Sequence, residues 1–240
     1  MKKIYSILIS IVLLCSLSLT SYAAGIPMPD TSSPDYLHNV ERHEEYFNNF
    51  TLPSQLTRDV TYKILDVPCY EQTEGYCGPT SCQMIIKYHT NQKIDLNILG
   101  GRLGMDSLPN GPSADGLSNL LNSYIGSNKY CYMQLPKNST ATSTLRNWTV
   151  DSINNNYPII LQTMTSSLPG YGGLNYNHYI VAKGYRFGTL GASSADIIVY
   201  NDPYKDSDTP NTYGVHEIDF SAMSSAITAN TAGFVVKRTV

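Results

Sequence analysis

Residues 72–81, Gln-Thr-Glu-Gly-Tyr-Cys-Gly-Pro-Thr-Ser, constrain the fold more than any other segment because they fix where a helix begins. Pro79 suits the first turn of a helix, where its missing N–H costs no hydrogen bond. Apolar side chains that recur at helical spacing follow it: Met84, Ile85 and Tyr88. A helix N-terminus has unpaired N–H groups and the positive end of the helix dipole, which favour a thiolate. The segment therefore predicts that Cys77 lies at the tip of a buried helix.

Residues 1–23 have the pattern of a secretory signal peptide. Lys2 and Lys3 precede the mostly apolar residues 4–19, and Ser21-Tyr22-Ala23 is a small-x-small cleavage site. A retained membrane anchor is the weaker alternative, because the apolar stretch is shorter than the ~20 residues that a spanning helix needs. We expect cleavage after Ala23 and a secreted protein, extracellular or associated with the cell surface.

Charge narrows the class of partner. Removal of Lys2 and Lys3 changes the formal net charge from −3 to −5, and no basic stripe is present, so nucleic acid is not an expected partner. No second long apolar run follows, so we expect no membrane span in the mature chain. Residues 59–240 have the length of one ordinary domain.

Residues 24–58 differ from the rest of the chain. Their first part is rich in proline and other turn-forming residues, and residues 39–50 carry apolar side chains at helical spacing. We interpret the segment as an N-terminal extension with a short amphipathic helix packed on the domain. A propeptide or a linker are the alternatives.

Helices come early in the chain and strands cluster late, which predicts an α+β fold rather than an alternating parallel sheet. The predicted helices cover residues 77–89, 96–102, 115–124 and 142–154. The predicted strands cover residues 61–68, 129–135, 157–164, 179–185, 197–200 and 233–237. Residues 166–177 are predicted to form a loop rich in glycine and tyrosine.

The mature chain has four cysteines: Cys69, Cys77, Cys82 and Cys131. An exported protein with an even count can form disulfides, but a nucleophilic Cys77 must stay free. A Cys69–Cys131 bridge and no pairing at all therefore both remain open. The spacings contain no C-x2-C pair of the kind found in zinc sites, so we expect no metal and no other cofactor.

A thiol nucleophile needs a base, usually histidine, and a third group that holds the imidazole. His178 stands where the predicted glycine- and tyrosine-rich loop meets a strand, which is where a rigid element borders a cleft. Downstream, Asn201 and Asp202 end another strand just before Pro203. If the two strands pair, either residue could reach the His178 ring; the alternative is a plain Asn-Asp-Pro turn.

Three short motifs together resemble a known family. They are Gln72 followed after four residues by Cys77-Gly78, then Asn177-His178-Tyr179, then Asn201-Asp202-Pro203. In this order they resemble the papain-like cysteine peptidases, and in particular the bacterial C39-like group related to double-glycine leader peptidases. The resemblance covers about residues 60–238.

The resemblance implies a papain-like fold in which the nucleophile helix packs on an antiparallel sheet. It also implies a role for four residues: Cys77 as nucleophile, His178 as base and then acid, Asp202 as the group that orients His178, and Gln72 as oxyanion donor with the Cys77 N–H. Asn201 is the alternative orienting group.

The implied function is that of a secreted cysteine peptidase that cleaves a peptide or protein substrate through an acyl-enzyme. Tyr76 stands where many leader peptidases have an acidic residue, so their substrate is not carried over. An amidase, acyltransferase or transglutaminase could use the same residues, and a non-catalytic binding module on the fold is the third alternative.

Overall fold

The computed structural model describes residues 28–49, 61–107, 111–190, 193–194, 196–207, 209 and 211–240. The predicted signal peptide and the predicted domain boundary near residue 58 lie outside these residues. Across the described residues, no helix has both the length and the apolar character needed to cross a membrane.

Within the described residues, the main sheet has seven strands in the order β2-β9-β3-β4-β7-β8, with β1 paired to β4. Each of these pairings is antiparallel. The strands are β1 (Thr61–Ile64), β2 (Tyr130–Gln134), β3 (Ile159–Met164), β4 (Asn177–Phe187), β7 (Ile197–Asp202), β8 (Gly214–Asp219) and β9 (Phe234–Arg238). A short hairpin, β5 (Thr189–Leu190) with β6 (Ser193–Ser194), extends from β4.

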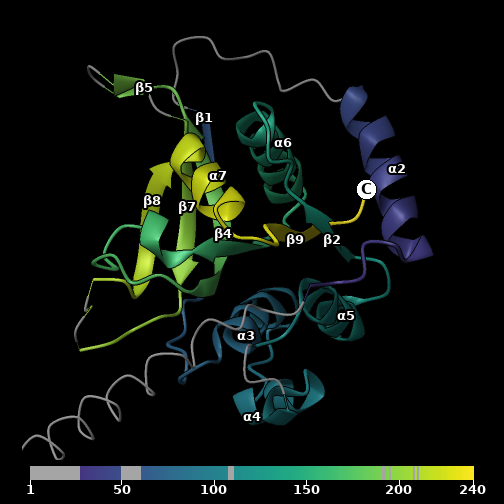
Figure 1. Ribbon diagram of the computed structural model, residues 1–240, viewed down its shortest axis with the longest axis vertical. Coiled ribbons are helices and arrows are strands. Elements are labelled where there is room, and N and C mark those ends of the chain that lie inside the picture. The colour runs from purple at the N-terminus through teal and green to yellow at the C-terminus, as the bar shows by residue number, and fades with distance from the viewer. Residues whose placement is uncertain are drawn as a thin grey trace, which may run out of the picture.

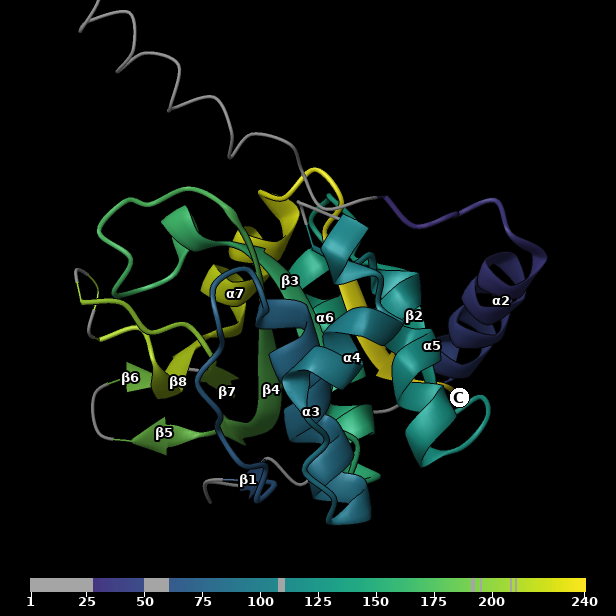
Figure 2. The ribbon, with the colours of Figure 1, turned by 90° about the horizontal axis from the view of Figure 1, so that it is seen from below.

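Helices cover both faces of this sheet. The helices are α2 (Pro34–Asn48), α3 (Cys77–Thr90), α4 (Leu96–Arg102), α5 (Ala114–Ile125), α6 (Ala141–Asn154) and α7 (Phe220–Thr228), with 3-10 turns η1 (Met105–Ser107) and η2 (Thr165–Ser167). Helices α3, α4 and α5 lie on one side, and α6 and α7 on the other (Figures 1 and 2). Central strands β3 and β4 are therefore almost continuously buried.

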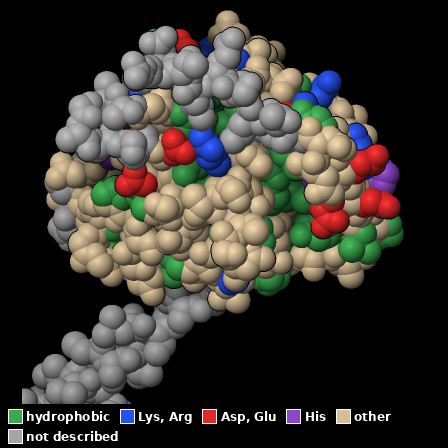
Figure 3. Space-filling model, turned by 90° about the horizontal axis from the view of Figure 1, so that it is seen from above, with side chains coloured by type: hydrophobic (Ala, Val, Ile, Leu, Met, Phe, Trp, Pro, Cys, Tyr) green, Lys and Arg blue, Asp and Glu red, His purple; other side chains and the backbone are tan. Residues whose placement is uncertain are grey.

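The predicted α+β, papain-like class is confirmed, because α3 packs against the long antiparallel strand β4. The predicted starts of α3, α4, α5 and α6 also agree with the structure to within one residue. Asp95 caps α4 by accepting a hydrogen bond from Asn97 N–H at 2.8 Å. On the face shown in Figure 3, charged side chains are few.

The sequence patterns missed strand β8, helix α7 and the short β5–β6 hairpin. β8 is the strand at one end of the sheet, and its residues are alternately exposed and partly buried, which gives a weak apolar signal. Helix α7 follows β8 with no intervening turn, since Asp219 ends the strand and is also the N-cap. Helix α2 begins five residues earlier than predicted, at Pro34, because Ser33 accepts a hydrogen bond from Tyr36 N–H at 3.2 Å.

The Cys69–Cys131 pairing is wrong, and the four described cysteines are all free. Cys131 lies on β2, whereas the Cys69 thiol donates to the carbonyl of Asp202, the last residue of β7, at 3.6 Å. Four strand spacings separate β2 from β7 in the sheet order, which is roughly 19 Å. A disulfide requires Cα atoms within about 7 Å.

Candidate active site

Cys77 is the first residue of α3, as the sequence predicts, and its side chain is partly exposed. The next residue must be small, because a Cβ on Gly78 would lie 2.6 Å from Pro112 Cγ. The hydroxyl of Tyr179 on β4 donates to the Pro112 carbonyl at 3.0 Å. The segment before α5 is thereby fastened over the first turn of α3, beside the cysteine.

His178 and Asp202 meet because β4 and β7 are antiparallel, so the end of β7 lies beside the start of β4. His178 Nε2 lies 2.8 Å from Asp202 Oδ1, and each side chain is 1% exposed. An Nε2–H that donates to the carboxylate leaves Nδ1 for a second partner. The Cys77 side chain interacts with the same ring. The structure thus brings together three of the four predicted site residues.

The charge state of His178 follows from these contacts. Burial alone would lower the pKa of His178, but the Asp202 carboxylate and the Cys77 side chain raise it to about 10. His178 therefore keeps its proton at neutral pH. An imidazolium beside the Cys77 sulfur stabilises a negative charge on that sulfur.

Both carboxylate oxygens of Asp202 have donors. Oδ1 accepts from His178 and from the Tyr204 N–H at 2.9 Å, and Oδ2 accepts from the Tyr171 hydroxyl at 2.8 Å. Tyr171 belongs to the predicted loop and was not singled out from the sequence. The signal that could have drawn attention to it is the run of tyrosines just before His178.

Asn201, the alternative orienting residue, is bonded elsewhere. Its Nδ2 donates to the carbonyls of Val67 and Pro68, each at 3.0 Å. Successive residues of a strand point to opposite faces of the sheet, so Asn201 fastens the segment that leads to the Gln72 motif while Asp202 contacts His178.

Gln72 lies next to the end of β7, because its backbone N–H donates to the Pro203 carbonyl at 2.8 Å. Its side-chain Oε1 is buried without a hydrogen-bond partner among the described residues. The structure therefore places Gln72 beside the Asp202 segment.

Two other histidines have partners away from Cys77. His89 Nε2 lies 3.1 Å from the Tyr130 hydroxyl at the far end of α3, and His216 Nε2 lies 2.7 Å from the Thr212 carbonyl. Within the described ranges, no three His, Cys, Asp or Glu side chains are grouped as metal ligands would be.

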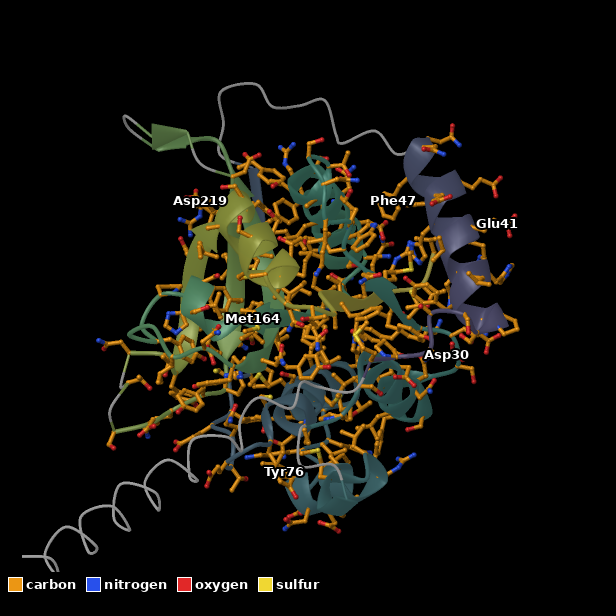
Figure 4. All side chains as sticks on the ribbon, in the orientation of Figure 1. Asp30, Glu41, Phe47, Tyr76, Met164 and Asp219 are labelled. Carbon is orange, nitrogen blue, oxygen red and sulfur yellow. The ribbon has the colours of Figure 1, made fainter. Side chains whose placement is uncertain are left out.

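A second histidine also contacts a cysteine. His43 on α2 is 2% exposed, with Nε2 3.2 Å from Cys131 Sγ and Nδ1 3.0 Å from Lys237 Nζ. Cys131 on β2 and Lys237 on β9 are register partners. Phe47 stacks on His43 and faces the sheet, whereas Glu41 points away from it (Figure 4).

The electrostatics of this second pair are the reverse of those at His178. Burial and then the Lys237 charge lower the pKa of His43 to about 2, and burial lowers the pKa of Lys237 to about 8. His43 is therefore neutral, and the contacts fix α2 on strands β2 and β9.

Comparison with known proteins gives three findings. No curated protein matches the chain. The structure is similar to the crystal structure of the peptidase domain of Streptococcus ComA, a bi-functional ABC transporter involved in a quorum sensing pathway, with 15% identity and a TM-score of 0.41 over 73% of this chain and 96% of that chain. The model of the Peptidase_C39 like family matches residues 64–226, a range that includes Cys77, His178 and Asp202. The chain therefore belongs to the Peptidase_C39 like family.

Proposed function

We propose that the protein is an exported cysteine peptidase that hydrolyses peptide bonds through an acyl-enzyme on Cys77. One observation carries the proposal: the Cys77 side chain and the Asp202 carboxylate both interact with the buried His178 ring. A nucleophile, a base and an orienting group are thus in contact in a chain that belongs to a peptidase family. Export is proposed from the signal-peptide pattern of residues 1–23.

In the acylation step, the Cys77 thiolate attacks the carbonyl carbon of the scissile bond. The His178 imidazolium then donates its Nδ1 proton to the leaving amine, and Asp202 keeps the ring in position through Nε2. Neutral His178 next takes a proton from water, which attacks the thioester and releases the acid.

The developing oxyanion needs donors that are already in place. The N–H of Cys77 lies in the first turn of α3, where backbone N–H groups have no partner inside the helix. Gln72, held beside the site by its bond to Pro203, would supply the second donor through its side-chain amide. A donor of this kind is typically worth about 2.7–4 kcal/mol of barrier.

Selective alkylation tests the proposal, and the other described cysteines provide internal controls. Burial, followed by the Asp202 charge, raises the pKa of Cys69 to about 11, and burial raises the pKa of both Cys82 and Cys131. Iodoacetamide at pH 6, followed by peptide mass spectrometry, should label Cys77 at least tenfold faster than these three. Reaction of Cys77 no faster than that of a free model thiol would reject the activated nucleophile.

The same thioester could be attacked by an amine in place of water. Product masses from mixed peptides, with and without an added amine, separate the two outcomes. We expect free carboxyl ends in both samples; amide products would instead indicate a transferase.

A further inference from the structure

We infer that Tyr171 is a positioning residue of this site, which holds the second oxygen of Asp202 and through it the orientation of His178. The inference rests on the proposed function and extends the site to the loop that precedes β4.

The contact between Tyr171 and Asp202 is buried and short. Tyr171 is 1% exposed, and its hydroxyl donates to Asp202 Oδ2 at 2.8 Å. Burial, and then the charge of Asp202, raise the pKa of Tyr171. The Tyr171 hydroxyl therefore stays protonated, and remains a hydrogen-bond donor, over the whole pH range in which the enzyme would work.

The carboxylate needs this donor to stay in one orientation. Oδ1 receives both the His178 ring and the Tyr204 N–H, so Tyr171 is the partner of Oδ2 among the described residues. The terminal torsion of an aspartate is broad, and a buried oxygen without a donor is costly. Loss of the Tyr171 hydroxyl would let the carboxylate rotate and would weaken its bond to His178.

Ring contacts hold Tyr171 in place. Its ring stacks on Tyr204, with centroids 5.5 Å apart at 28°, and meets the His178 ring edge-on at 5.9 Å. Tyr176 meets His178 edge-on from the same loop, at 6.5 Å. Tyr204 also meets the His178 ring edge-on, at 6.0 Å, so three tyrosines border the imidazole.

The test compares Tyr171→Phe with Tyr130→Phe. Tyr130 is a matched control because it is 2% exposed and its hydroxyl donates to the Pro158 carbonyl at 3.0 Å, away from the site. We expect Tyr171→Phe to lower kcat on a cleaved peptide about tenfold with little change in KM. In histidine NMR, the His178 titration should move down by about one pH unit. Tyr130→Phe should change neither.

A double-mutant cycle with Asp202→Asn separates positioning from general destabilisation. If Tyr171 acts through the carboxylate, adding Tyr171→Phe to Asp202→Asn should slow the reaction less than twofold. Equal slowing in both backgrounds, or a folded Tyr171→Phe with unchanged kcat and unchanged His178 titration, would overturn the inference.

If Tyr171→Phe does not fold, the Tyr171 hydroxyl proton can be followed by NMR without replacing Tyr171. Its exchange with solvent should quicken in Asp202→Asn, and unchanged exchange would contradict the contact. If the wild-type protein neither cleaves peptides nor labels at Cys77, the proposed function is rejected instead. The effect of Tyr171→Phe on the His178 titration can still be measured in that case.

Discussion

Two buried histidines in this protein each lie between a cysteine and a charged side chain, which is negative in one case and positive in the other. His178 lies between Cys77 and the Asp202 carboxylate, whereas His43 lies between Cys131 and the Lys237 ammonium. The pKa of His178 is raised to about 10 and that of His43 is lowered to about 2. The same pair of residue types thus yields an imidazolium in one region and a neutral ring in the other.

Contact between a cysteine and a histidine therefore does not by itself make a nucleophile. The third partner sets the charge of the ring, and exposure decides whether a substrate can reach the sulfur. Cys77 is partly exposed at the tip of α3, whereas Cys131 is 3% exposed under α2. The His43 cluster therefore holds α2 in place, and the His178 cluster has the features of a reactive site.

The largest expected effect is the difference in activity between variants of Cys77 and of Cys131. Cys77→Ala should lower peptide hydrolysis by about 10⁴-fold or more, because the nucleophile is lost. Cys131→Ala is the matched control and should leave kcat/KM within about twofold, with a loss of about 1 kcal/mol in the free energy of unfolding. Both are measured with the same peptide and by urea denaturation. Activity retained in Cys77→Ala would favour a non-catalytic binding module.

The next largest effect is expected from replacing Asp202, the charged partner of His178. Asp202→Asn should lower kcat by about 10²–10⁴-fold, because the ring loses its orienting carboxylate. It should also lower the pKa of His178, since the Asp202 charge is the main influence that raises it. The alkaline limb of the pH–rate profile then moves toward neutral pH.

Asp151→Asn provides the control for this prediction. Asp151 is a buried carboxylate on α6 that accepts from the Tyr46 hydroxyl at 2.9 Å. Its replacement should leave the pH–rate profile in place. A matching shift in both variants would mean that the effect is not specific to the His178 contact.

The two histidines should also destabilise the fold at opposite ends of the pH scale. The folded pKa of His178, about 10, lies above its ordinary value of 6.5, so its contribution is present below pH 6.5 and is lost as pH rises toward 10. The folded pKa of His43, about 2, lies below 6.5, so its contribution is present above pH 6.5 and is lost as pH falls. Urea denaturation from pH 4 to pH 10 should show a flatter acid side for His43→Gln and a flatter alkaline side for His178→Gln. The reverse assignment would refute the comparison.

The smallest expected effect is that of Lys237→Met. Replacement of a buried charge by an apolar side chain of similar length is often neutral or stabilising, and Lys237 is fully buried. We expect the free energy of unfolding to stay the same or to rise by about 1 kcal/mol, with the labelling rate of Cys77 unchanged. A large loss of stability would show that the ammonium is needed to dock α2.

The candidate site residues that could be predicted from the sequence lie at the ends of helices and strands. Cys77 precedes the helix-starting Pro79, His178 begins a strand after a glycine-rich loop, and Asp202 ends a strand before Pro203. Each boundary has a local chemical signal, so the three positions could be proposed before their contacts were known.

Residues whose roles depend on distant contacts could not be predicted. Tyr171 lies in a loop whose path is set by its packing on Tyr204 and His178. His43 and Lys237 are 194 positions apart, and no local pattern joins them. The wrong Cys69–Cys131 pairing has the same origin, because the order of strands in the sheet was not available from the separate strand patterns.

The opposite charge states of His178 and His43 can be measured directly by an NMR titration of the labelled histidine rings from pH 4 to pH 10.5. We predict that His178 remains an imidazolium past pH 8 and that His43 remains neutral down to pH 5. Titration of both rings near pH 6.5, the ordinary value for a histidine, would contradict the claim that Asp202 and Lys237 set their opposite charge states.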